Sequence, residues 1–232
     1  MMSGKRWGYV VQFFCLLVFF GMSPFLIKMD GRKTMSVSSD SVRSQNVSDE
    51  VKPVVALTFD DGPNASSTPI LLDGLRERKV RATFFLIGEN VEKDENEKIV
   101  KRMYEEGHLI GNHTYTHCNL SKLETGEAKK ELEQTDTVIE KITGKQPVFV
   151  RAPYGELPVD SEQDLNRIYI GWTVDPLDWM TEDTGAVVKT VVEEINPGDV
   201  ILLHDCYKSS VEAALRIVDL LKAEGFEFVT VD

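Results

Sequence analysis

The stretch VVALTFDDG, residues 54–62, decides how the rest of the chain is understood. It starts with an apolar run typical of a buried strand, and Gly62-Pro63 marks a turn at its end. Because side chains alternate along a strand, Asp60 and Asp61 are expected to point in different directions. One carboxylate could then bind a metal while the other handles a proton; the simpler interpretation is a turn that only ends the strand.

The composition is that of an ordinary globular protein. The 232 residues suffice for one large domain, and 42% are hydrophobic. The net charge of −12 argues against a nucleic-acid partner, because nucleic-acid binding depends on clustered Lys and Arg. Three cysteines form neither a disulfide framework nor a C-x-x-C zinc motif, and nothing in the sequence predicts a protein partner.

The N-terminus has the pattern of an export signal. Two basic residues, Lys5 and Arg6, precede an apolar stretch from Trp7 to Ile27 that is long enough to span a bilayer. Residues 1–28 are predicted to be a signal peptide or membrane anchor; the poor cleavage site favours the anchor. Residues 29–52, rich in Ser, Asp and Asn, are predicted to be a flexible linker, and residues 53–232 the folded domain.

Within that domain, strand-like and helix-like segments alternate, which predicts an α/β fold. Thr68 and Thr125 are expected to cap helices, and Gly144 to end one. The predicted strands cover residues 54–57, 82–88, 108–112, 148–150, 168–174, 200–203 and 226–231. The predicted helices cover residues 68–78, 96–106, 125–143, 186–195 and 210–224, with a stunted one at 161–167.

Five polar clusters follow apolar runs along the domain. In a parallel β/α barrel, strand ends of this kind meet at one mouth, where active sites are built. The regular placement therefore predicts that the clusters form a single site. They are Asp60-Asp61, HTYTH at 113–117, RAPYG at 151–155, DPLDW at 175–179 and His204-Asp205.

Two of only four histidines, His113 and His117, are spaced so that both rings can reach one cation, and Asp61 would complete a set of three ligands. Three-ligand sites with open positions are catalytic rather than structural. A cation there lowers the pKa of a bound water, and Asp60 could accept its proton. The alternative is two surface histidines in a polar loop.

A second proton must reach the leaving group, and His204 is the candidate acid because histidine titrates near neutrality. Either Asp178 or Asp205 could keep it charged. Arg151 could clamp a carboxylate, although a surface arginine and a helix-capping Asp205 are the simpler alternatives.

The remaining polar candidates are interpreted as structural. His108 precedes the histidine pair in a Gly-His-Leu-Ile-Gly segment and is predicted to be a hydrogen-bonded structural residue rather than a ligand. Cys118 and Cys206 are predicted to be free thiols packed near the site rim, with a disulfide or a thiol ligand as the alternative.

Taken in order, the motifs TFDDG, HTYTH, RAPYG, DPLDW and LLHD resemble those of the polysaccharide deacetylase family, the NodB-homology domain of carbohydrate esterase family 4. The resemblance covers residues 54–231. It implies a distorted (β/α) TIM-like barrel and a divalent metal, commonly Zn²⁺, with Co²⁺, Mn²⁺ or Ni²⁺ as alternatives.

The resemblance also implies roles for individual residues. It assigns metal binding to Asp61, His113 and His117, general base to Asp60 and general acid to His204. Arg151 would position Asp60, and Asp178 would pair with His204. The Tyr154 N–H would stabilise an oxyanion, while Trp179 and Leu202 would line the pocket for the acetyl methyl group.

Three departures from the family pattern leave these catalytic groups in place. The segment between Tyr154 and Asp175 is short, Cys118 stands where a proline is expected, and the chain ends soon after its last strand. The expected function is removal of acetyl groups from cell-wall glycan outside the cytoplasm, foremost peptidoglycan. Chitooligosaccharide or acetylxylan deacetylation and an inactive glycan-binding pseudoenzyme are the alternatives.

Overall fold

The computed structural model describes residues 52–93, 95–158 and 166–232. The predicted signal or anchor at 1–28, nearly all of the predicted linker, and most of the short helix predicted at 161–167 lie outside these residues. Within the described ranges, no helix combines the length and the apolar character that crossing a membrane requires.

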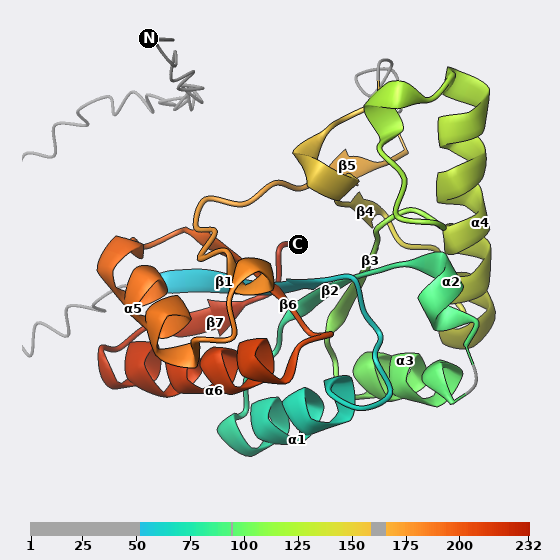
Figure 1. The fold of residues 1–232 in the computed structure, drawn as a ribbon. Helices are drawn as coiled ribbons and strands as arrows, with labels where there is room; N and C mark the ends of the chain where they lie inside the picture. Colours follow the sequence, from blue (N-terminus) through green and yellow to red (C-terminus); the bar gives the residue numbers. More distant parts are fainter. Residues whose placement is uncertain (1–51, 94, 159–165) are drawn as a thin grey trace, which may run out of the picture. The chain divides into compact units, whose positions relative to one another are not determined.

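Parallel strands form one sheet at the centre of the fold (Figure 1). Their order is β5-β4-β3-β2-β1-β6, and β7 pairs separately with β1. The sheet was expected from the alternation of strands and helices, because parallel neighbours need crossover connections. The strands are β1 (Val54–Asp60), β2 (Thr83–Leu86), β3 (Leu109–Asn112), β4 (Phe149–Val150), β5 (Ile168–Tyr169), β6 (Val200–His204) and β7 (Glu227–Val229).

The first strand, β1, is the centre of the sheet, and every residue after Val54 is buried. It pairs with β6 along most of its length, while β7 covers its first half and β2 its second. The register with β6 places Asp60 directly opposite His204. The register therefore brings two chemically active residues, far apart in sequence, to the same point of the sheet.

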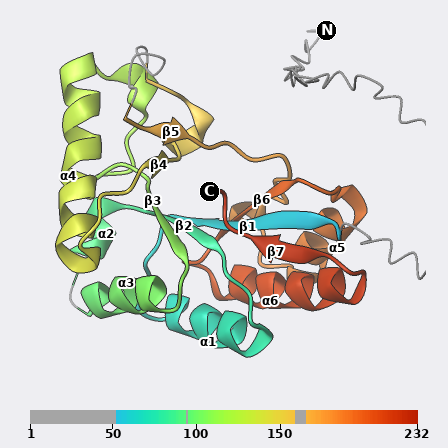
Figure 2. The same cartoon turned by 180° about the vertical axis from the view of Figure 1, so that it is seen from behind.

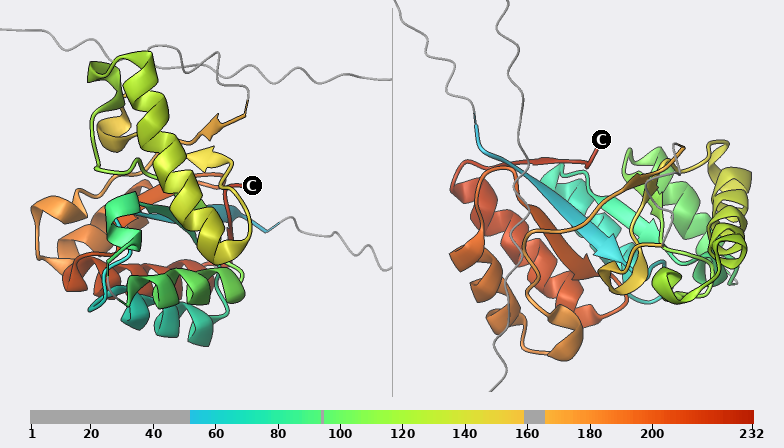
Figure 3. Two further views of the ribbon diagram at one scale, coloured as in Figure 1. Left: turned by 90° about the vertical axis from the view of Figure 1, so that its right-hand side faces the viewer. Right: turned by 90° about the horizontal axis from the view of Figure 1, so that it is seen from above.

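Helices cover the outside of the sheet, and α6, α1 and α3 lie side by side along one face (Figures 1 and 3). Contacts follow the sequence α5–α6–α1–α3–α4 around the fold. Their buried faces and the strands form the main apolar core, which includes Phe59, Phe84 and Leu203. The helices are α1 (Thr68–Arg78), α2 (Gly88–Val91), α3 (Asn96–Glu105), α4 (Thr125–Thr143), α5 (Thr184–Glu194) and α6 (Lys208–Ala223).

The five longer predicted helices are confirmed, with small differences at the ends. Ser67 and Glu124 occupy the capping positions before α1 and α4, so the two threonines predicted as caps are the first helical residues. Gly144 ends α4 in the left-handed conformation, as predicted. The short helix α2 was not predicted, because four residues are too few for a helical period.

The expected barrel is present as a curled, parallel half-barrel, seen from behind in Figure 2 and from above in Figure 3. The prediction of one continuous strand at 168–174 was wrong. Ile168 and Tyr169 pair with β4, whereas Val174 forms an isolated bridge to Ile201 of β6. The chain thus changes its strand partner from β4 to β6 within six residues.

Candidate active site

The predicted polar residues converge at the carboxyl ends of the strands. Asp60 and His204 end β1 and β6, while His113 and Arg151 directly follow β3 and β4. Since all these strands are parallel, their carboxyl ends share one edge of the sheet. The structure therefore places these four residues at the same edge of the sheet.

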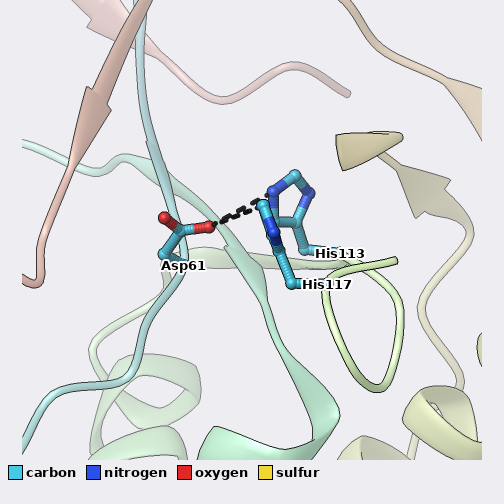
Figure 4. Close-up of side chains that lie close together, drawn as sticks. All are labelled: Asp61, His113 and His117. Atoms are coloured by element: carbon cyan, nitrogen blue, oxygen red, sulfur yellow. Dashed lines mark ion pairs between the residues drawn. The ribbon is translucent and has the colours of Figure 1, made fainter. Parts of the chain in front are cut away.

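Asp61 faces two imidazoles, those of His113 and His117, which lie next to each other (Figure 4). Its Oδ1 atom is 3.4 Å from His113 Nε2 and 3.3 Å from His117 Nε2. Asp61 directly follows β1 and has a φ of 71°, in the left-handed region. Among the described residues, this buried Oδ1 has no hydrogen-bond partner. One carboxylate oxygen and two imidazole nitrogens that face each other in this way fit a divalent cation such as Zn²⁺.

The protonation of these three groups suits metal binding. The carbonyl of Arg151 lies 2.7 Å from His113 Nδ1, so a proton on Nδ1 is donated there and Nε2 is left with its lone pair. Burial lowers the pKa of His117, which keeps its ring neutral. Burial raises the pKa of Asp61, but His113 and the other nearby histidines outweigh it and hold that pKa below its ordinary value.

Asp60 is held by a buried arginine. Arg151 Nη1 donates to Asp60 Oδ1 at 2.9 Å and to Thr58 Oγ1 at 2.7 Å. Its other nitrogens donate to the carbonyls of Ile170 and Gly171, just beyond β5. The predicted clamp is therefore present, and Arg151 also ties β1 to the segment after β5. The second oxygen of Asp60 is 3.7 Å from His113 Nε2, beside the three candidate metal ligands.

His204 is paired with Asp178, which settles the choice that the sequence left open. Asp178 accepts hydrogen bonds from the backbone N–H and Nδ1 of His204, both at 2.8 Å. Burial lowers the pKa of His204, but Asp178 and the site aspartates outweigh it and raise that pKa to about 8. Asp205 instead accepts a hydrogen bond from Thr68 at the start of α1, and burial raises its pKa to about 7.

The three residues predicted to contact substrate lie in different settings. Tyr154 is exposed, and its ring stands edge-on to His117 with centroids 4.9 Å apart. Trp179, in a short 3₁₀ turn directly after Asp178, is half exposed. Leu202 is buried two residues before His204, on the same side of β6.

The residues interpreted as structural are confirmed as such. His108 is buried, and its Nδ1 accepts a hydrogen bond from the Ala82 N–H. Burial lowers the pKa of His108 to about 4, so the ring is neutral. Cys118 and Cys206 are free thiols, and burial raises both of their pKa values.

Sequence reasoning missed the groups that support the site. Thr58 contacts Arg151 inside the core, and Asn112 bridges Thr114 and Asp136. Glu131, on α4, binds the loop between the two histidines. The one available signal was that Glu131 is a charged residue next to the predicted apolar stripe of α4.

Comparison with known proteins agrees with these motifs. The family model described as polysaccharide deacetylase matches residues 48–170. A peptidoglycan-N-acetylglucosamine deacetylase of Bacillus cereus is 41% identical over 186 residues, covering 77% of this chain and 67% of the relative. The peptidoglycan-N-acetylmuramic acid deacetylase PdaC of Bacillus subtilis is 38% identical, covering 82% of this chain but only 40% of the relative.

Solved structures show the same fold. The structure of PdaC matches with a TM-score of 0.75 over 78% of this chain and 89% of that one. A family 4 acetyl xylan esterase from Clostridium thermocellum, solved with a cobalt ion, matches with a TM-score of 0.72 at 33% identity, over 77% of this chain and 88% of that one. From the family model, the identity to these relatives and the shared fold, the chain belongs to the polysaccharide deacetylase family.

Proposed function

We propose that this protein is a metal-dependent hydrolase that removes acetyl groups from the N-acetylated sugars of peptidoglycan. The observation that carries the proposal is the unpartnered Asp61 Oδ1, which faces the Nε2 atoms of His113 and His117. These three residues would hold the cation, for which Zn²⁺ is the first candidate. A bound cation would lower the pKa of the attacking water and polarise the acetyl carbonyl.

The proton-transfer groups stand on either side of these ligands. Asp60, oriented by Arg151, takes a proton from the attacking water. His204 carries a proton at pH 7 because Asp178 stabilises its charged form, and it gives this proton to the departing amine nitrogen. His204 Nε2 is 4.0 Å from Asp61 Oδ2, so the acid and the ligand set serve one reacting centre.

Three further residues near this centre would contact the substrate. The Tyr154 N–H stabilises the developing oxyanion, which is the usual electrostatic aid in acyl transfer. Leu202 and Trp179 enclose the acetyl methyl group from the acid side. Trp179 directly follows Asp178, and Leu202 lies two residues before His204 on the same side of β6.

The substrate assignment rests on the relatives, whose names specify peptidoglycan amino sugars. Such a substrate lies outside the cytoplasm, in keeping with an export signal or anchor at residues 1–28 and a linker to the domain. Acetylxylan is the second candidate, because a structural neighbour at 33% identity is an acetyl xylan esterase. The relatives differ in whether N-acetylglucosamine or N-acetylmuramic acid is deacetylated, so experiment must decide between these two sugars.

The test measures acetate released by the full chain, loaded with Zn²⁺ or Co²⁺, from peptidoglycan, chitin oligomers and acetylxylan. We expect release from peptidoglycan that is lost in Asp60→Asn with metal content unchanged. Acetate from acetylxylan alone would reassign the substrate. Metal binding without acetate from any of the three would favour a glycan-binding pseudoenzyme, although that class predicts an incomplete set of catalytic groups.

A further inference from the structure

The segment His113–His117, here called the histidine loop, is held in an unfavourable backbone conformation. Thr114 and His117 have φ angles of 65° and 58°. Residues other than glycine disfavour this left-handed region, and a β-branched threonine does so strongly. Such a conformation persists only where the surrounding structure holds it in place.

On one side, a single carboxylate binds the middle of the histidine loop. Oε2 of Glu131 accepts hydrogen bonds from the backbone N–H groups of Tyr115 at 3.0 Å and Thr116 at 2.8 Å. The Thr116 hydroxyl lies 3.1 Å from both oxygens of the same carboxylate. Hydrogen bonds to an ionised acceptor are stronger than neutral ones, so Glu131 is the main partner of the loop's N–H groups.

On the other side, the first turn of α2 binds the loop's carbonyl groups. The Gly88 N–H donates to Thr114 O and the Glu89 N–H to Tyr115 O, both at 3.0 Å. Gly88 allows this approach because a Cβ atom there would collide with Tyr115 and Thr135. With two of its carbonyls bound at α2, the loop is held on its other side by Glu131, which accepts from two successive N–H groups.

The two histidines of the loop depend on it to different degrees. His113 is also oriented by the bond between its Nδ1 and the Arg151 carbonyl. Among the described residues, His117 has no side-chain hydrogen bond of this kind, so the loop backbone sets the position of its ring. That ring must keep its Nε2 directed at Asp61 Oδ1, 3.3 Å away.

We infer that Glu131 is a positioning residue of the metal site. By accepting the Tyr115 and Thr116 N–H groups, it fixes the loop so that the His117 ring faces Asp61. The inference rests on the proposed function, because it requires a cation at Asp61, His113 and His117. Groups that orient metal ligands from behind typically affect metal affinity by about 10- to 100-fold.

The test measures Zn²⁺ affinity of the metal-stripped full chain by competition with a chromophoric chelator. Glu131→Ala is expected to weaken Zn²⁺ binding by about 10- to 100-fold. The matched control is Glu133→Ala on the same helix, where the side chain is 56% exposed and pairs with Lys129; it should bind as the wild type does. Glu131→Gln should recover most of the affinity, because its amide oxygen can still accept both N–H groups.

The outcomes separate this inference from its alternatives. Wild-type affinity in Glu131→Ala, even with a lowered melting temperature, would show a merely structural role and overturn it. If Glu131→Ala does not fold, Glu131→Asp decides, since its shorter side chain cannot reach both N–H groups: weaker binding supports the inference and wild-type binding overturns it. Wild-type protein that binds no Zn²⁺ would overturn the proposed function as well.

Discussion

The proposed metal-binding side of the site and its proposed acid side are built in different ways. The metal side uses residues in left-handed conformations on loops after β1 and β3, Asp61 and His117, each held by its surroundings. The acid side uses His204, the last residue of a regular strand, and a single carboxylate from Asp178. Removing one residue of the metal side should therefore remove both the bound metal and the activity. Removing a residue of the acid side should lower the rate or shift its pH dependence while the metal stays bound.

The largest expected effect is on the metal side. His113→Ala should lose bound metal and deacetylase activity together, because two ligands no longer define a site. Metal analysis after dialysis and acetate release measure both. His108→Gln is the control, since His108 directly precedes β3, at the end opposite to His113, and its Nδ1 accepts a hydrogen bond from the Ala82 N–H. Full metal content in His113→Ala would contradict the ligand assignment.

The second-largest effect is expected from Arg151, which holds the proposed base Asp60, and it should appear in the stability of the protein. Arg151→Ala should lower the free energy of unfolding by about 3–5 kcal/mol, because it leaves the buried Asp60 carboxylate without its partner. Urea unfolding measures the change. Arg78→Ala breaks the more exposed pair with Asp219 and should cost about 1 kcal/mol or less. Equal effects of the two substitutions would argue that Arg151 does not hold a charged Asp60.

Removing the acid should reduce the rate without removing the metal. His204→Ala is expected to lower kcat by about 10²- to 10⁴-fold, the usual contribution of a positioned acid or base. Zn²⁺ content should remain that of the wild type, because His204 lies outside the ligand set. Loss of metal in this variant would show that the two sides of the site are not separate.

The smallest effect should be a shift along the pH axis. The pKa of His204 is raised from 6.5 to about 8, so the charged pair with Asp178 stabilises the protein below pH 6.5 and is lost as pH rises through 8. The rate should fall over the same alkaline range. In Asp178→Asn the alkaline limb of kcat/KM should move to about pH 6.5 or below, because burial then lowers the pKa unopposed by Asp178. An unchanged alkaline limb would show that a group other than His204 sets it.

The order of elements and the residues brought together could be predicted from the sequence, because both depend on local patterns. Apolar runs marked the strands, and the polar residues after them marked one edge of a parallel sheet. The spacing of His113 and His117 in the sequence was enough to indicate a shared cation.

The supporting contacts could not be predicted, because they join segments that only tertiary packing brings together. Glu131 lies 15 residues from Thr116, and Thr58 lies 93 from Arg151. The division of the strand predicted at 168–174 has the same cause. Ile168 and Tyr169 pair with β4, whereas Val174 pairs with β6. The sequence of the segment alone does not indicate either partner.

The central claim is that Asp61, His113 and His117 hold one cation. Anomalous diffraction at the zinc edge, from crystals of the protein grown with Zn²⁺, tests it most directly. The account predicts a peak at about 2.0–2.2 Å from an Asp61 oxygen and from both Nε2 atoms. The absence of a peak there, or a Zn²⁺ ion bound by other residues, would contradict it.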